Sequence, residues 1–138
     1  MAESNFLDVF RSAYEQGNEA FNRGDFQTAF GGLPDEFEFY TWPDSPEPGP
    51  HRGPGGVIRF FTDLRATLGG WSAKPTEYID AGNGIVIVAI AVSGMAESVG
   101  LYAGGMGFQV WETRDLVPLR CREFASRKEA LEAAGLAA

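Results

Sequence analysis

Two ionisable side chains stand in a proline- and glycine-rich stretch near the middle of the chain and could act as an acid–base pair. Asp44 and His51 lie between residues 43 and 56, a stretch with five prolines and four glycines. Imidazole is the side chain that ordinarily titrates near neutral pH, so the pair suits proton abstraction beside a carbonyl. A solvated loop histidine and an aspartate that caps its own turn are the simpler interpretation.

A third acid–base candidate is Tyr14, on the apolar stripe of a helix that we predict from about residue 4 to 23. Its hydroxyl could reach a cavity on that side of the helix. A core tyrosine with a hydrogen-bonded hydroxyl is the alternative. The spacing therefore names Tyr14, Asp44 and His51 as candidate catalytic residues.

Two arginines alternate along a predicted last strand from residue 117 to 124. Arg120 and Arg122 share one face with Phe124. If that face lines a pocket, the ligand should be anionic or develop negative charge, because guanidiniums bind carboxylates, enolates and phenolates strongly. Pairing with Glu112 or Glu123, or plain solvation, is the alternative.

The chain is rich in aromatic residues, with 11 Phe, 4 Tyr and 3 Trp in 138 residues. This exceeds what a small core usually needs, so a pocket lined by aromatic residues is a natural use for the surplus. A glutamine on a predicted strand from 101 to 112 could add a hydrogen bond. Together with the arginine face, the candidate ligand-binding residues are Trp42, Phe60, Trp71, Phe108, Gln109, Arg120, Arg122 and Phe124.

Composition limits the class of protein. The formal charge of −8 disfavours nucleic acid and anionic membrane surfaces as partners, and no apolar run is long enough to span a membrane. We therefore expect a cytoplasmic protein and a single domain over residues 1–138. One cysteine and one histidine predict neither a disulfide nor a zinc cluster, and no phosphate loop or dinucleotide fingerprint implies a cofactor.

The run from Ile85 to Val92 organises the predicted fold. It is apolar at odd and even positions, so both faces of this central strand must be covered, one by helices or a pocket and the other by a second layer or a second subunit. Around it we predict a short helix after Asp25, a strand at 36–42, a loop at 43–56, a helix at 57–68, a strand at 71–80 and a last helix at 128–134.

The order of these elements and several short motifs carry a family resemblance. The motifs are Asn22-Arg23-Gly24-Asp25, His51-Arg52-Gly53, Val110-Trp111 with Arg114-Asp115, and Arg122-Glu123-Phe124 followed by residues 129–136. The chain resembles SnoaL-like members of the nuclear-transport-factor-2-like superfamily. The resemblance implies an α+β fold, a cone-shaped, curved, mainly antiparallel sheet with the N-terminal helices packed on its concave face.

That superfamily includes ketosteroid isomerase, polyketide cyclases, dehydratases and members without catalytic activity, so the fold alone does not fix a function. The resemblance puts Arg120, Arg122 and Phe124 on the concave face and implies a homodimer through the convex face. Ketosteroid isomerase uses a tyrosine, a carboxylate base and a protonated aspartate. The corresponding positions here are Gly17, Trp42 and Gln109.

Three hypotheses follow. The first is a cofactor-free isomerase, cyclase or dehydratase that acts on a carbonyl or cyclic substrate by acid–base chemistry. The second is a non-catalytic module that binds a small hydrophobic or acidic ligand. The third is a dimeric interaction domain of the same fold.

Overall fold

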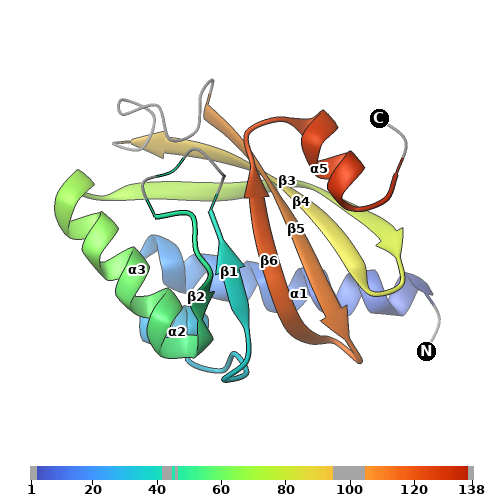
Figure 1. The fold of residues 1–138 in the computed structure, drawn as a ribbon, viewed down its shortest axis with the longest axis horizontal. Helices are drawn as coiled ribbons and strands as arrows, with labels where there is room; N and C mark the ends of the chain where they lie inside the picture. The colour runs from blue at the N-terminus through green and yellow to red at the C-terminus, as the bar shows by residue number, and fades with distance from the viewer. Residues whose placement is uncertain (1–2, 42–44, 46, 95–104, 137–138) are drawn as a thin grey trace.

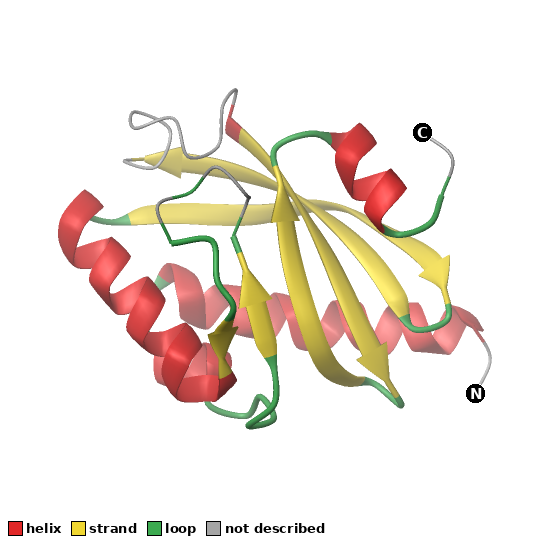
Figure 2. Cartoon of the chain, viewed as in Figure 1, coloured by secondary structure: helices red, strands yellow, loops and turns green. Residues whose placement is uncertain are grey.

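The structure is a computed structural model and describes residues 3–41, 45, 47–94 and 105–136. It is an α+β fold built on one curved, open sheet (Figures 1 and 2). The helices are α1 (Glu3–Asn22), α2 (Phe26–Phe30), α3 (Gly53–Leu68) and α5 (Arg127–Ala133). The strands are β1 (Glu38–Tyr40), β2 (His51–Arg52), β3 (Trp71–Gly82), β4 (Ile85–Gly94), β5 (Met106–Arg114) and β6 (Val117–Phe124).

The sheet has six strands in the order β2-β1-β6-β5-β4-β3. Every neighbouring pair is antiparallel except β1 and β6, which are parallel. The predicted α+β class, with a mainly antiparallel curved sheet and N-terminal helices, is therefore confirmed. Within the described part of the chain, no helix is long and apolar enough to cross a membrane.

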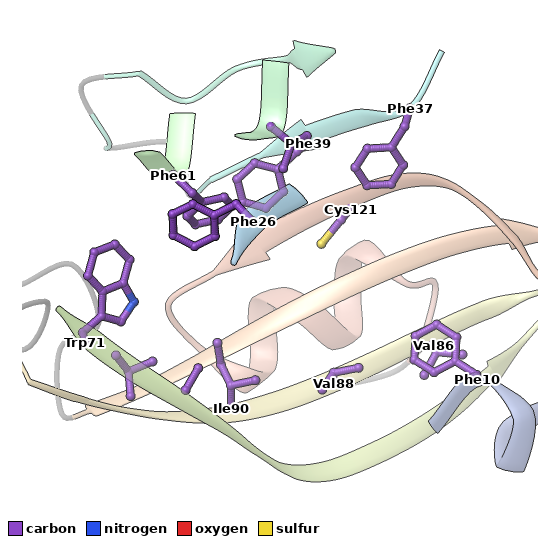
Figure 3. Packing of buried hydrophobic residues seen from close by; sticks show 13 residues of the cluster. Phe10, Phe26, Phe37, Phe39, Phe61, Trp71, Val86, Val88, Ile90 and Cys121 are labelled. Atoms are coloured by element: carbon purple, nitrogen blue, oxygen red, sulfur yellow. The ribbon is translucent and has the colours of Figure 1, made fainter. Parts of the chain in front are cut away.

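The central strand β4 is covered on both faces, as its composition predicts. Val86, Val88 and Ile90 point into the main core, together with Phe26 and Phe61 from the helices (Figure 3). On the opposite face, Ile87 packs with Val110 of β5 and with Ala130 of α5, and all three are almost fully buried. A second layer, the C-terminal helix, thus covers part of the convex face.

Two asparagines of the N-terminal helix α1 form hydrogen bonds with the edge strand β3 of the sheet. The side-chain amides of Asn18 and Asn22 both donate to the Ala73 carbonyl, each at 2.9 Å, and the Ala73 N–H donates to Asn22 Oδ1 at 2.9 Å. These bonds satisfy backbone groups of an edge strand that would otherwise lack a neighbour. They hold α1 against the β3 edge of the sheet.

The proline- and glycine-rich stretch contains more regular structure than the sequence predicts. His51 and Arg52 form β2, paired with Phe39 and Glu38, and α3 begins at Gly53 rather than at residue 57. The prediction of a loop through residue 56 was therefore wrong. Proline is favoured in the first turn of a helix because its missing N–H has no intrahelical partner there, and Pro54 occupies such a position.

The β5–β6 hairpin contains two local features that set its register. Asp115 and Leu116 form a two-residue turn in which both residues have positive φ, 51° and 66°. Farther along, Thr113 pairs with Pro118 but Glu112 pairs with Arg120, so β6 carries one extra residue in a bulge. Because side chains alternate along a strand, this extra residue reverses which face each later side chain of β6 occupies.

The two faces of β4 should respond differently to the same truncation. Ile87→Ala removes side-chain volume from the sealed contact with α5 and should cost about 2–5 kcal/mol of unfolding free energy. Ile90→Ala, the matched control, enlarges a cavity that Ile90 already lines and should cost less. Urea denaturation of both variants measures the difference, and a larger loss in Ile90→Ala would contradict the described packing.

Candidate functional site

A cavity of about 220 Å³ lies between the concave face of the sheet and the N-terminal helices. Most of its wall is apolar and aromatic, with Phe10 and Phe21 from α1, Phe61 from α3 and Trp71 from β3. Its polar lining residues, in addition to the indoles of Trp71 and Trp111, are Tyr14, Asn18, Gln109 and Glu123. Among the described residues that line it there is no lysine, arginine or histidine.

Four of these residues form one hydrogen-bonded network inside the cavity. The Tyr14 hydroxyl donates to Gln109 Oε1 at 2.7 Å, and the Trp111 indole N–H donates to the same oxygen at 2.9 Å. The Gln109 amide N–H in turn donates to Glu123 Oε2 at 2.9 Å. The Glu123 side chain is therefore the acceptor of the third hydrogen bond in this network.

Strand register brings this network together. Gln109 and Glu123 are cross-strand partners on β5 and β6, and Trp111 lies two residues from Gln109, on the same face. Glu123 is only 3% exposed, although acidic side chains are seldom fully buried without a hydrogen-bond partner. Buried carboxylates in apolar cavities are common sites of acid–base chemistry.

Burial also controls the other ionisable groups beside the network. The pKa of Tyr14 lies well above the ordinary phenol value, chiefly because burial penalises the phenolate and secondarily because Cys121 and Glu123 are near. Burial likewise raises the pKa of the Cys121 thiol. Both groups are therefore neutral at physiological pH.

The structure brings three of the predicted site residues into the cavity. Tyr14, Trp71 and Gln109 all line it, as does Gly17, one of the positions singled out by the resemblance. Phe60 is not among the lining residues and instead packs against His51, with the rings tilted and their centroids 4.3 Å apart. Phe108 and Phe124 are cross-strand partners that pack with α5 on the convex face. Trp42 lies outside the described residues.

The predicted acid–base pair is not assembled in the described structure. His51 is absent from the cavity wall, and its Nε2 lies 2.9 Å from the Glu47 carbonyl. A carbonyl oxygen can only accept, so Nε2 carries the proton and donates. Asp44 lies outside the described residues, so its predicted role stays a prediction.

The arginine face was assigned to the wrong side of the sheet. Arg120 and Arg122 point away from the cavity and both pair with Glu112, Arg122 at 3.6 Å; Arg122 also donates to the Ala133 carbonyl at 3.2 Å. The physical reason is the bulge in β6, which turns Cys121 and Glu123 inward and the arginines outward. These two arginines therefore do not face a ligand in the cavity, and the expectation of an acidic ligand loses its support.

Glu123 is the functional candidate that the sequence reasoning missed. In the sequence it stands two residues after Cys121, and a carboxylate on the same alternation as a cysteine, a residue type that is usually buried, was the available signal. The cavity lining also includes Asn18 on α1, whose predicted helix position was correct but whose polar side chain was not considered. No cluster of three metal-ligating side chains occurs within the described residues.

Comparison with solved structures identifies the fold. The chain is similar to Bal32a from a soil-derived mobile gene cassette, at 19% identity over 93% of this chain and 97% of that chain, with a TM-score of 0.70. It is also similar to TerC co-crystallised with polyporic acid, at 18% identity over 91% and 98%, TM-score 0.67. A nuclear-transport-factor-2-like protein from Burkholderia thailandensis matches at 17% identity over 91% and 96%, TM-score 0.66.

Other similar structures include proteins provisionally described as a polyketide cyclase and a ketosteroid isomerase. No protein-family model matches this sequence, and a search of curated proteins finds no match. The chain therefore has the nuclear-transport-factor-2-like fold, in agreement with the predicted resemblance. Identities below 20% establish the fold and leave the activity to be argued from the cavity.

The position of the arginines predicts that Arg122→Met leaves the cavity intact. Arg122 Nε is buried without a hydrogen-bond partner, so the substitution should leave the thermal midpoint unchanged or raised. Affinity for an apolar cavity ligand such as 2-naphthol should be unchanged, as isothermal titration calorimetry would show. A large loss of affinity in Arg122→Met, with the fold retained, would restore the arginines to the site.

The raised pKa of Tyr14 predicts a loss of stability at alkaline pH. Above about pH 10 the unfolded chain loses the phenol proton while the folded chain keeps it, so the unfolding free energy falls as pH rises. Tyr14→Phe should make the decline between pH 9 and about pH 11 shallower. Urea titrations across this range measure both slopes, and equal slopes would refute the burial of this phenol.

Proposed function

We propose that this protein is an acid–base enzyme that acts on an apolar ring compound with a carbonyl group and needs no bound cofactor. The observation that carries the proposal is the buried Glu123 carboxylate facing an aromatic cavity. A general base needs a position within hydrogen-bond reach of the proton it takes, and an enclosed apolar wall excludes water that would compete for it.

Each polar residue has a role in this reaction. Glu123 takes a proton from the carbon beside the carbonyl, and the resulting carboxylic acid can return the proton to a different carbon of the ring system, which isomerises the substrate. Gln109 donates to Glu123 Oε2 and holds the carboxylate in one orientation. The aromatic walls orient the flat ring by contact, as in other apolar ligand sites.

The developing charge on the carbonyl oxygen needs a hydrogen-bond donor. Asn18 lines the cavity, and its amide nitrogen has two hydrogens, of which one goes to the Ala73 carbonyl. The second hydrogen of that amide is the donor we assign to the substrate oxygen. Because Ala73 and β3 hold the amide in place, it does not need to reorganise during the reaction.

Hydrogen–deuterium exchange at carbon tests this proposal without knowledge of the natural substrate. A panel of ring ketones that includes 2-tetralone is incubated with the protein in D₂O, and loss of the carbon-bound protons is followed by NMR. We expect the wild-type protein to accelerate exchange for at least one ketone and Glu123→Gln to abolish the acceleration, because an amide cannot take the proton.

The matched control is Glu112→Gln, which removes a carboxylate from the opposite face of the sheet and should exchange like the wild type. If ring ketones bind and no exchange is accelerated, the ligand-binding alternative holds in place of the enzyme.

TerC with polyporic acid shows that a protein of similar fold has been crystallised with a small molecule, which favours a ligand-filled cavity over a sealed interaction domain. A homodimer through the convex face stays a prediction.

A further inference from the structure

Trp111 belongs to the hydrogen-bond network but has no role in the proposed reaction. Its indole is enclosed by aromatic rings, edge-on to Tyr14 at 6.0 Å and to Phe10 at 6.3 Å between centroids, and tilted against Phe37 at 5.8 Å. These contacts fix the ring plane and therefore the direction of its N–H. That N–H donates to Gln109 Oε1 at 2.9 Å.

An indole N–H can donate but never accept, so it determines which way the Gln109 amide points. If the amide turned over, its NH₂ group would face the indole N–H, and two donors would oppose each other. Its carbonyl oxygen would at the same time face the Glu123 carboxylate, and two acceptors would oppose each other. Trp111 thus excludes the turned-over amide, whatever the protonation state of Glu123.

The fixed amide also sets the direction of the remaining bonds. Because Oε1 faces both Trp111 and Tyr14, the Tyr14 hydroxyl donates its only proton to Gln109. The Tyr14 oxygen can then only accept a hydrogen bond from a ligand. Glu123 accepts from the other side of the same amide. At Tyr14 and Glu123 the cavity consequently offers acceptors to a ligand, while the donor assigned above to Asn18 lies outside this network.

We propose that Trp111 is a positioning residue that locks the direction of this network, so that the cavity takes apolar ring compounds that carry a hydroxyl or enol donor at the Tyr14 end. The inference rests on the proposed function only for the role of Glu123 as base. It extends that function by naming the ligand class, phenols and enols, and the residue that selects it.

Few other ionisable groups surround Glu123 in the described structure. Tyr14 from α1 and Cys121 from β6 are neutral, since burial raises the pKa of both. Tyr78 of β3 lies behind Tyr14, in an edge contact at 5.8 Å, and its hydroxyl donates to Glu15. Arg122 and Glu112 lie on the other face of the sheet. A protonation that changes the hydrogen bonds of this network near neutral pH is therefore assigned to Glu123.

The first test is the pKa of the Glu123 carboxyl group, obtained from the NMR chemical shift of its carboxyl carbon as a function of pH in wild-type protein and in Trp111→Phe. Without the indole the amide can turn over when Glu123 is protonated, which stabilises the acid, so the pKa should rise by about one pH unit. Tyr78→Phe is the matched control, because it removes a hydroxyl beside Tyr14 that is outside the network, and it should leave the pKa unchanged. An equal pKa in wild type and Trp111→Phe overturns the lock.

The second test is the ligand class, measured by calorimetry with 2-naphthol and its methyl ether 2-methoxynaphthalene, of which only the naphthol can donate a hydrogen bond. Wild type should prefer the naphthol by about tenfold, and Trp111→Phe should reduce the preference. Equal affinity in wild type overturns the ligand class. Should Trp111→Phe fail to fold, Gln109→Leu replaces it, because it removes both ends of the lock and should also raise the Glu123 pKa; an unchanged value overturns the proposal.

These measurements are independent of turnover. Hydrogen–deuterium exchange of ring ketones by wild type and Glu123→Gln tests the proposed enzyme activity. The titration of the carboxyl group and the comparison of the two ligands test the hydrogen-bond network in the absence of any reaction. If the protein binds 2-naphthol selectively but catalyses no exchange, the positioning role of Trp111 stands and the proposed enzyme activity is wrong. If it catalyses exchange but shows no preference for a donor, the enzyme activity stands and the positioning role is wrong.

Discussion

The register of the β5–β6 hairpin is the constraint on which the site depends. Gln109 and Glu123 meet because Glu112 pairs with Arg120, and that pairing requires the extra residue in β6 between Pro118 and Arg120. Without the bulge, the side chains beyond it would exchange faces, which would put guanidiniums into the aromatic cavity and the carboxylate outside. One inserted residue thus decides the charge of the cavity.

The same register organises the charges on the convex face. Arg52, Glu38, Arg120 and Glu112 occupy neighbouring positions on β2, β1, β6 and β5, so that positive and negative side chains alternate across four strands. Arg52 pairs with Glu38 at 2.8 Å and Arg120 with Glu112. These pairs are partly exposed and contribute little stability individually, but they give each arginine a counter-ion outside the cavity.

Local patterns in the sequence were sufficient to predict most of the fold. The apolar run at Ile85 to Val92 predicted a strand covered on both faces, and the alternation from Val117 to Phe124 gave the bounds of β6. The faces of β6 could not be predicted, because alternation carries no information about a bulge, which depends on pairing with β5. Glu123 was missed for this reason, whereas Tyr14 on α1 and Gln109 on β5, which do not themselves carry the extra residue, were placed correctly in the cavity.

Leu116 illustrates how the hairpin and the cavity constrain each other. Positive φ usually favours glycine or asparagine, because a side chain at Cβ crowds the backbone there, yet Leu116 adopts a φ of 66° and lines the cavity. A glycine at this position would relieve the backbone but remove an apolar side chain from the cavity wall. The strain is located at the turn that sets the register, and strained residues persist where the surrounding structure determines them. The register of the hydrogen-bond network and part of the apolar cavity wall therefore depend on the same two-residue turn.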